Sequence, residues 1–304
     1  MPAHFCGVFA HKPSLDLLPM RVSAPPRIPS VPGRVDLAVP GPMARSAADL
    51  RVALGLLAGP DELTEGIGYR LMLPEPRHGT LKDFRVLVID SHPLCPTAAS
   101  VRAALNELAG RLERAGCSVS RTPPGGLAEL TRTYVYLLAA FAAADVPVGD
   151  HRFIEMAANN VPRDDGSLRA SRLRGITATH RDWILAERTR SRFRQQWREL
   201  FKSIDVVLCP CMPTPAFPHD HSEPARDRQL DIDGVKVPYG DQIVWAAAAT
   251  LLGLPATAAP ITRSPEGLPI GVQIIGSYLE DRTTIAFAAM IEREFGGFVP
   301  PPGL

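Results

Sequence analysis

The stretch GLPIGVQIIG, residues 267–276, is typical of a tight turn that leads into a buried strand. Glycine and proline mark the turn, and the β-branched residues Val272, Ile274 and Ile275 favour a core strand. Gln273 is the one polar side chain within this apolar run. A buried amide must be hydrogen-bonded or face a cavity. Gln273 therefore either forms a structural tie, that is, hydrogen bonds that join parts of the fold, or belongs to the wall of a binding site. The structural tie is favoured, since most buried polar groups have hydrogen-bond partners within the protein.

The composition is that of an ordinary globular protein, with 45% hydrophobic and 21% charged residues among 304. A formal net charge of +1 gives no overall attraction to nucleic acid or acidic membranes. The five cysteines are odd in number and scattered, so reduced thiols in a cytoplasmic protein are expected. The N-terminus lacks the basic start and the long apolar middle of a signal peptide.

We expect a single domain over residues 1–304, with a proline-rich extended segment at 1–42 and a long loop at 211–239. The uncharged segment 243–261 is nearly as long as the ~20 residues that a membrane span needs. Gly253, Pro255 and Pro260 interrupt it, which favours a buried helix followed by a buried strand.

Hydrophobic periodicity and turn residues divide the rest of the chain into helices and strands. Strand, helix and strand over 84–120 predict a βαβ unit with parallel strands, and its first turn lacks the glycine-rich loop of dinucleotide sites. Trp183 is an expected core residue of a long helix, and Asp281 an expected helix cap. Helices are predicted over 46–57, 100–115, 127–144, 179–202, 241–252 and 281–295, and strands over 6–10, 84–90, 117–120, 205–208, 256–261 and 270–275.

Two groups of residues are candidate ligand sites, one for a metal ion and one for RNA. Cys209, Cys211, His219 and His221 are residue types that zinc accepts, but their spacing matches none of the common zinc patterns. The prolines between them account for a stiff loop, so no metal site is predicted. Residues 163–202 are rich in arginine, which fits either an RNA-facing helix or a solvated helix face. The solvated face is favoured because the segment has no interleaved aromatic platform for base stacking.

The sequence alone shows no complete set of catalytic residues. No Gly-x-Ser-x-Gly motif occurs. Lys12 and Ser14 stand close together, but Pro13 separates them and no oxyanion-hole glycines accompany them. Cys6 lies on an expected apolar strand without an adjacent base, which favours an inert core thiol.

Four blocks in chain order resemble the amidase signature family of serine hydrolases and together cover nearly the whole chain. The blocks are PAHFCGVFAHKPS (2–14), GPMARSAADL (41–50), DVVLCP (205–210), and LGLPA with GLPIGVQIIG (252–256 and 267–276). The resemblance implies an α/β fold with a large mixed sheet between helices, amide hydrolysis to an acid and ammonia or an amine, and no metal or organic cofactor. The family mechanism uses a serine nucleophile, a second serine in a cis peptide, a proton-relaying lysine, and glycine-rich backbone amides that bind the oxyanion.

In the family, these catalytic residues lie N-terminal to the block matched by residues 2–14. The resemblance therefore implies the C-terminal part of an amidase, with the substrate-pocket wall and without the chemical centre. Lys12 matches a structural lysine of the family, so no catalytic residue is carried over. Apolar surroundings and family position make Trp245, Thr250 and Gln273 the expected pocket wall.

We therefore expect a truncated amidase that is inactive by itself and binds a small amide substrate if an N-terminal segment completes it. The alternative is a non-catalytic binding or structural subunit, or the C-terminal half of a split amidase. A homodimer is a possible assembly. An RNA-contacting module is a weaker alternative, and neither nucleic acid nor a membrane is an expected partner.

Overall fold

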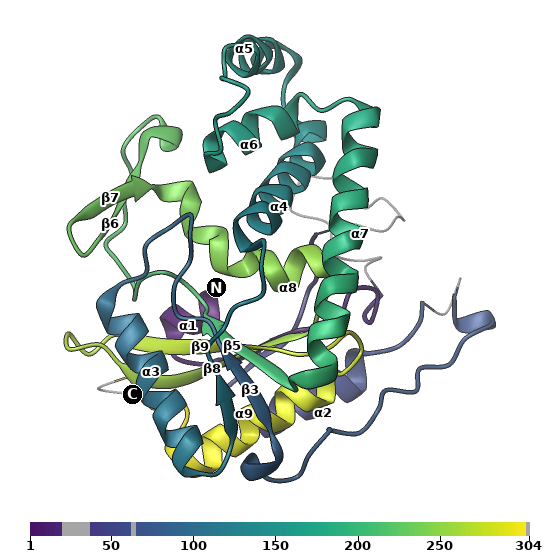
Figure 1. The fold of residues 1–304 in the computed structure, drawn as a ribbon, viewed down its shortest axis with the longest axis vertical. Coiled ribbons are helices and arrows are strands. Elements are labelled where there is room, and N and C mark those ends of the chain that lie inside the picture. Colours follow the sequence, from purple (N-terminus) through teal and green to yellow (C-terminus); the bar gives the residue numbers. More distant parts are fainter. Residues whose placement is uncertain (20–36, 62–64, 302–304) are drawn as a thin grey trace.

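A mixed seven-stranded sheet forms the middle layer of the protein, in a computed structural model that describes residues 1–19, 37–61 and 65–301. The strand order is β2-β1-β8-β9-β5-β3-β4. β3 runs parallel to β4 and β5, and the other neighbouring strands are antiparallel (Figure 1). The strands are β1 (Phe9–Lys12), β2 (Met43–Ala44), β3 (Arg85–Val88), β4 (Ser118–Ser120), β5 (Val206–Pro210), β8 (Ala256–Arg263) and β9 (Pro269–Ile275).

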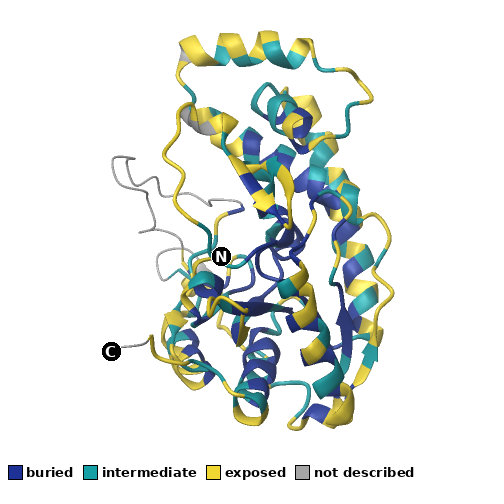
Figure 2. Ribbon diagram, turned by 90° about the vertical axis from the view of Figure 1, so that its left-hand side faces the viewer, coloured by how far each residue is buried: buried dark blue, intermediate teal, exposed yellow. Residues whose placement is uncertain are grey.

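Alternating side chains of the central strands enter two separate hydrophobic cores, as the two-residue period of a strand requires. Val86 and Val206 face one core, whereas Leu87 and Val207 face the other. The first core is closed by α2 (Ala47–Leu57), α3 (Ala99–Arg114) and α9 (Asp281–Phe295). The second is closed by α4 (Leu127–Ala142), α7 (His180–Ser203) and α8 (Ala247–Leu252). The sheet is therefore buried on both faces (Figure 2).

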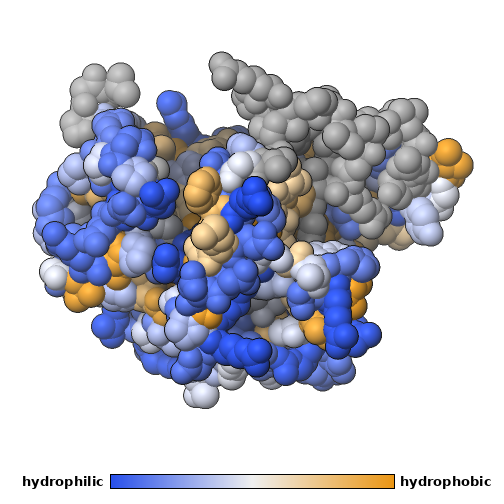
Figure 3. Space-filling view, turned by 90° about the horizontal axis from the view of Figure 1, so that it is seen from above, coloured by the Kyte–Doolittle hydropathy of each residue, from blue (hydrophilic) through white to orange (hydrophobic). Residues whose placement is uncertain are grey.

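The remaining helices lie at the periphery. α5 (Val148–Asn159) and α6 (Leu168–Ile176) extend beyond α4 at the end of the molecule farthest from the sheet (Figure 1). Seen from that end, the surface is mostly hydrophilic, with apolar patches among the polar side chains (Figure 3). Short 3₁₀ turns complete the chain at η1 (Glu65–Ile67), η2 (Leu81–Asp83), η3 (Ala143–Asp145), η4 (Ala225–Asp227) and η5 (Tyr239–Ala246).

The main sequence predictions are confirmed. β3, α3 and β4 form the parallel βαβ unit, and β8 and β9 form the antiparallel hairpin. Segment 243–261 folds as η5 and α8 followed by β8, and within the described residues no helix is long and apolar enough to cross a bilayer. Ser46 caps α2 by accepting a hydrogen bond from the Asp49 amide at 3.0 Å.

The predicted strand at 6–10 is wrong in its first half. Pro2 occupies the first turn of a short helix, α1 (Pro2–Cys6), where its missing N–H costs nothing. Gly7 ends this helix in the left-handed conformation with φ 63°, so that β1 begins only at Phe9. Cys6 is consequently exposed, and the expectation of a core thiol there is also wrong.

Three further expectations differ from the structure. The predicted loop at 211–239 contains a hairpin, β6 (Gln229–Ile232) and β7 (Val235–Pro238), whose Asp233-Gly234 turn has both φ angles positive. Trp183 is 39% exposed and stacks on His180 at the surface instead of entering the core. Asp281 begins α9 and bonds to residues of the N-terminal block. Residues 20–36 of the predicted proline-rich segment lie outside the described residues.

The buried Asp281 carboxylate joins the two ends of the described chain. It accepts hydrogen bonds from the Ser14 amide at 2.8 Å, from Ser14 Oγ at 2.7 Å and from His11 Nε2 at 3.0 Å. Burial alone would raise the pKa of Asp281, but the hydrogen bonds from His11 and Ser14 outweigh it and lower the pKa. The carboxylate therefore holds β1 and the following turn against α9.

A second carboxylate, Asp205, anchors the start of β5. Arg85 donates to it from its backbone amide and its guanidinium, and Arg77 Nη1 lies 2.9 Å from Oδ1. The Asp205 side chain is 1% exposed. Burial would raise its pKa, but the hydrogen bonds and charges of Arg85 and Arg77 hold the pKa well below its usual range.

Replacing Asp281 by asparagine removes the charge that His11 and Ser14 bind. We expect Asp281→Asn to lower the free energy of unfolding by about 3 kcal/mol, because it disrupts a buried, fully bonded carboxylate. Urea denaturation followed by circular dichroism measures the change. Asp164→Asn, at an exposed position, is the matched control and should stay within about 0.5 kcal/mol of the parent. Equal stability of the two variants would contradict a structural role for Asp281.

The lowered pKa of Asp205 predicts an acid-sensitive fold. The unfolded chain takes up a proton near the ordinary aspartate pKa of about 4, whereas the folded chain resists protonation to lower pH. This contribution to stability is therefore present above pH ~4 and is lost as the pH falls through the folded pKa. Urea midpoints measured between pH 7 and pH 3 should fall less steeply in Asp205→Asn than in the parent. Parallel pH profiles would show that Asp205 does not contribute.

Candidate functional site

The candidate site lies where the carboxyl ends of the parallel strands β3 and β5 meet, an edge at which α/β sheets commonly bind ligands. The loops that follow the two strands are joined, since the Ala98 amide donates to the Pro213 carbonyl at 2.8 Å. β9 begins at the same edge, because Val272 pairs with Pro210. α1 precedes β1 there, with Met1 53% exposed.

His4 fastens α1 to this edge. Its Nδ1 accepts a hydrogen bond from the Gly271 amide at 3.0 Å, and its Nε2 lies 3.0 Å from the Thr214 carbonyl oxygen. The second contact requires Nε2 to carry the proton, so the neutral tautomer satisfies both partners. Burial lowers the pKa of His4, which favours this neutral form. The Thr214 hydroxyl beside it is buried and has no hydrogen-bond partner among the described residues.

Gln273 faces the α8 side of the sheet and ties three elements together. Its Nε2 donates to the Trp245 carbonyl at 2.8 Å and contacts Cys209 Sγ at 3.2 Å. The neighbours Val272 and Ile274 point to the opposite core, as the strand period requires. The structural contacts expected of a buried amide are therefore present.

The Trp245 ring is held from two sides and is 4% exposed. Its Nε1 donates to Thr97 Oγ1 at 3.1 Å, and His92 meets the ring edge-on at 5.3 Å between centroids. His92 Nδ1 accepts from the Leu94 amide, and its Nε2 lies 3.0 Å from Thr131 Oγ1. Burial lowers the pKa of His92 to about 4, so this imidazole is neutral at physiological pH.

Of the three predicted wall residues, the structure brings Gln273 and Trp245 into direct contact and holds Thr250 elsewhere. Thr250 is on α8 and forms a side-chain hydrogen bond with Tyr134 of α4. The cavity that Trp245, Cys209 and His92 line measures about 10 Å³, which is room for one water molecule. The wall role of these residues stays a prediction.

Sequence reasoning missed His4, His92, Thr97 and Thr214. Thr97 and His92 follow β3, and Thr214 follows β5, so the rule that places sites after parallel strands was the available signal. His4 gave no such signal, because its partners Gly271 and Thr214 are more than 200 residues away along the chain.

The neighbouring Lys12 and Ser14, which lie beyond the other end of the sheet beside Asp281, do not form an activated nucleophile. Ser14 is fully buried and donates to Asp281, so its hydroxyl has no imidazole base. Lys12 Nζ donates to the Pro13 carbonyl at 2.8 Å, and burial lowers its pKa to about 8. In the described part of the chain no group of three His, Cys, Asp or Glu side chains could hold a metal ion, and the zinc pattern at 209–221 was not expected to form one.

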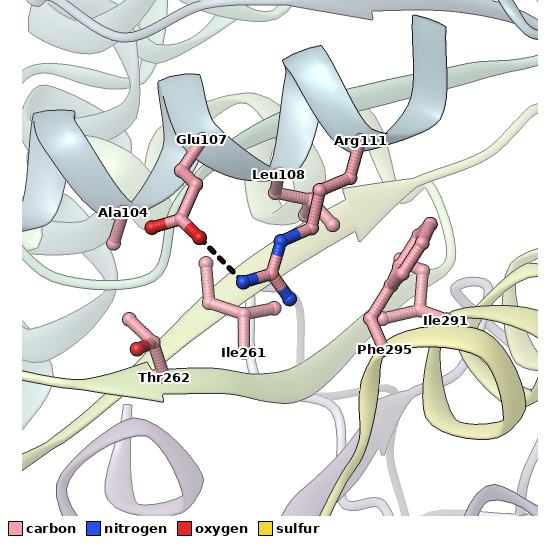
Figure 4. Close-up of a pocket in the computed structure, with 8 residues that line it drawn as sticks. All are labelled: Ala104, Glu107, Leu108, Arg111, Ile261, Thr262, Ile291 and Phe295. Carbon is pink, nitrogen blue, oxygen red and sulfur yellow. Dashed lines mark hydrogen bonds and ion pairs between the residues drawn. The ribbon is translucent and has the colours of Figure 1, made fainter. Parts of the chain in front are cut away.

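A depression between α3, β8 and α9 does not form an alternative site (Figure 4). Arg111 bonds to Glu107 within α3 and lies over the Phe295 ring at 6.0 Å. Ile261 closes the floor, and the remaining volume is about 10 Å³. These contacts are those of a packed surface groove.

A mixed sheet enclosed by helices on both faces, with polar groups at the carboxyl edge of its parallel strands, defines an α/β protein. The family described as Amidase matches residues 1–285, and the chain belongs to this family. Membership therefore extends over nearly the whole chain, and the resemblance drawn from the four sequence blocks is confirmed. The correspondence to the C-terminal part of the family fold stays a prediction.

Relatives and solved structures of the family differ in activity. An indoleacetamide hydrolase from Bradyrhizobium japonicum is 27% identical over 297 residues, covering 96% of this chain and 59% of that protein. A glutamyl-tRNA(Gln) amidotransferase subunit from Thermus thermophilus is 28% identical over 309 residues, covering 96% of this chain and 61% of that protein. The solved amidotransferase subunit from Thermotoga maritima has a TM-score of 0.70 at 20% identity, covering 96% of this chain and 59% of that chain. The chain thus spans 59–61% of the length of these proteins.

Replacing Gln273 by leucine tests the tie between β9 and the segment before α8. Gln273→Leu leaves the Trp245 carbonyl without its donor, which should cost about 1–3 kcal/mol of unfolding free energy. Because Trp245 then loses a restraint, its fluorescence emission should shift to longer wavelength. Gln195→Leu, on the exposed side of α7, is the control and should leave both readouts unchanged. A Gln273→Leu protein as stable as the control would refute the structural tie.

Proposed function

We propose that this chain supplies the substrate-binding wall of an amide-hydrolysing site and does not hydrolyse amides by itself. The observation that carries the proposal is the cluster of Gln273, Trp245 and Thr214 at the carboxyl edge of β5. Among the described residues, this cluster contains no serine, lysine or histidine free to act as nucleophile or base. Membership of the amidase family supports amide C–N bond hydrolysis as the reaction class. The proposed occupant is a small amide.

The chemistry proposed for the completed site is that of the family: a serine attacks the amide carbonyl, and a lysine relays protons through a second serine. In this chain the position nearest that chemistry is the start of α1. His4 holds α1 against the carboxyl edge of β5, so a polypeptide joined to Met1 begins beside Thr214 and Gly271. The proposal is that such a segment supplies the nucleophile, and that Trp245 and Thr250 then face the substrate. No metal or organic cofactor has a role in it.

A second candidate is a non-catalytic component of a larger assembly. It is supported by the relatives named as subunits of glutamyl-tRNA(Gln) amidotransferase, since a subunit by name belongs to an assembly of several chains. In that case a separate chain completes the site. In the first candidate the residues that complete the site are encoded in the same gene as this chain, and in the second they are encoded in another gene.

The hydrolysis test uses the 304-residue chain and an N-terminally extended form read from the same gene. The 304-residue chain should release no ammonia from indole-3-acetamide above the buffer level. If the bases before the start codon encode an in-frame Gly-Gly-Ser stretch, the extended chain should release ammonia, and substitution of the added serine by alanine should abolish that release. Hydrolysis by the 304-residue chain itself would refute the proposal.

The pocket wall is tested in whichever form is active. Trp245→Ala should raise KM at least about tenfold with a smaller effect on kcat, because it removes binding surface and not a reacting group. Trp183→Ala, at an exposed position, is the matched control and should leave both constants unchanged. If no extended reading frame exists, co-purification with the product of a neighbouring gene decides for the second candidate.

A further inference from the structure

A groove lies on the face of the sheet opposite Trp245. It measures about 880 Å³ and lies between α2, α9 and the extended segment 71–76. α2 and α9 pack side by side, with the Ala47 amide bonded to Glu292 near the end of α9. The groove is therefore bounded by two helices and one strap of chain, and it is separate from the candidate site.

Small side chains line the two helices where they face the groove, and they leave room for close approach of another backbone. On α2 they are Ala48 and Gly55, and on α9 they are Ala286 and Ala289. A Cβ built on Gly55 meets nothing within 4 Å, so the space above it is open. Val52 of the lining is 61% exposed, and Leu56, which lies outside the lining on α2, is 81% exposed.

The charged residues that line the groove are mostly basic. Arg51 stands on α2, and Arg282 and Arg293 stand on α9, against Glu75 on the strap. Arg282 is paired with Glu75, and Arg293 with Glu294. A second copy of this chain seated here through the same surface would bring its own arginines against these arginines.

We propose that this groove binds an amphipathic helix whose apolar stripe is flanked by acidic side chains. The apolar stripe covers the small residues of α2 and α9, and the acidic flank faces Arg51 on α2, next to the ion-paired Arg282 and Arg293 of the rim. A helix that lies along α2 for its full 11 residues is about 16 Å, or three turns, long. The indoleacetamide hydrolase relative has 59% of its length inside the region shared with this chain, so the family carries further polypeptide from which such a helix can come.

A designed peptide tests the proposal directly on the full chain. The probe is a fluorescein-labelled helix of about four turns with leucine and alanine on one stripe and glutamate on its flanks. The comparison peptide has lysine in place of every glutamate. Fluorescence anisotropy should show saturable binding of the acidic peptide and at least about tenfold weaker binding of the basic one. Raising the salt concentration should weaken the acidic peptide's binding, because the rim arginines are exposed to solvent.

Two variants locate the binding. Gly55→Leu fills the groove from an open position in α2, and leucine is a better helix former than glycine, so the protein should still fold. It should weaken binding of the acidic peptide by about tenfold or more. Gly149→Leu, at an equally open and exposed position in α5, is the matched control and should bind as the parent does. Arg51→Glu should reduce the preference for the acidic over the basic peptide.

Three results would overturn the proposal. The first is equal binding of the two peptides, and the second is binding unaffected by Gly55→Leu. The third is a concentration-dependent dimer in sedimentation equilibrium that Gly55→Leu dissolves, which would make a second copy the occupant. None of these readouts measures amide hydrolysis, so the outcome is independent of the proposed function.

Discussion

The fold depends on a buried carboxylate, Asp281, which accepts three hydrogen bonds. Asp281 lies 267 positions from Ser14 in the sequence, yet its two oxygens bind the Ser14 amide, the Ser14 hydroxyl and the His11 ring. A buried charge of this kind is costly unless every lone pair is used, so it tolerates only one arrangement of its partners. The interaction thereby fixes where β1 and the turn after it meet α9.

The same constraint explains why the serine, histidine and aspartate that cluster here do not form a catalytic triad. In a triad the histidine stands between the serine and the carboxylate, whereas here Asp281 stands between Ser14 and His11. The cluster is also closed to solvent. The proposed site lies instead at the carboxyl edge of β3 and β5, where Trp245, Gln273 and Thr214 lie.

Local patterns predicted most of the fold, because its elements follow regular periods. The βαβ unit, the β8–β9 hairpin and the capped α2 could each be derived from neighbouring residues alone. The failures have identifiable causes. Gly7 ends a helix that the apolar run at 5–10 did not indicate, and the Asp233-Gly234 turn was a hairpin signal within a segment assigned to a loop. Gln273 was recognised as exceptional within its strand, but its partners Trp245 and Cys209 lie 28 and 64 positions away, and no local pattern encodes such contacts.

The attachment of α1 by His4 has a practical consequence for anyone who expresses this protein. Met1 is half exposed and its helix is pinned beside Thr214 and Gly271, so whatever is fused to the amino terminus starts at the polar edge of the sheet. A purification tag in that position would begin beside the proposed ligand-binding edge. Removing the tag by proteolysis before any binding measurement is therefore part of a sound design, and a difference between tagged and cleaved protein would itself report on access to that edge.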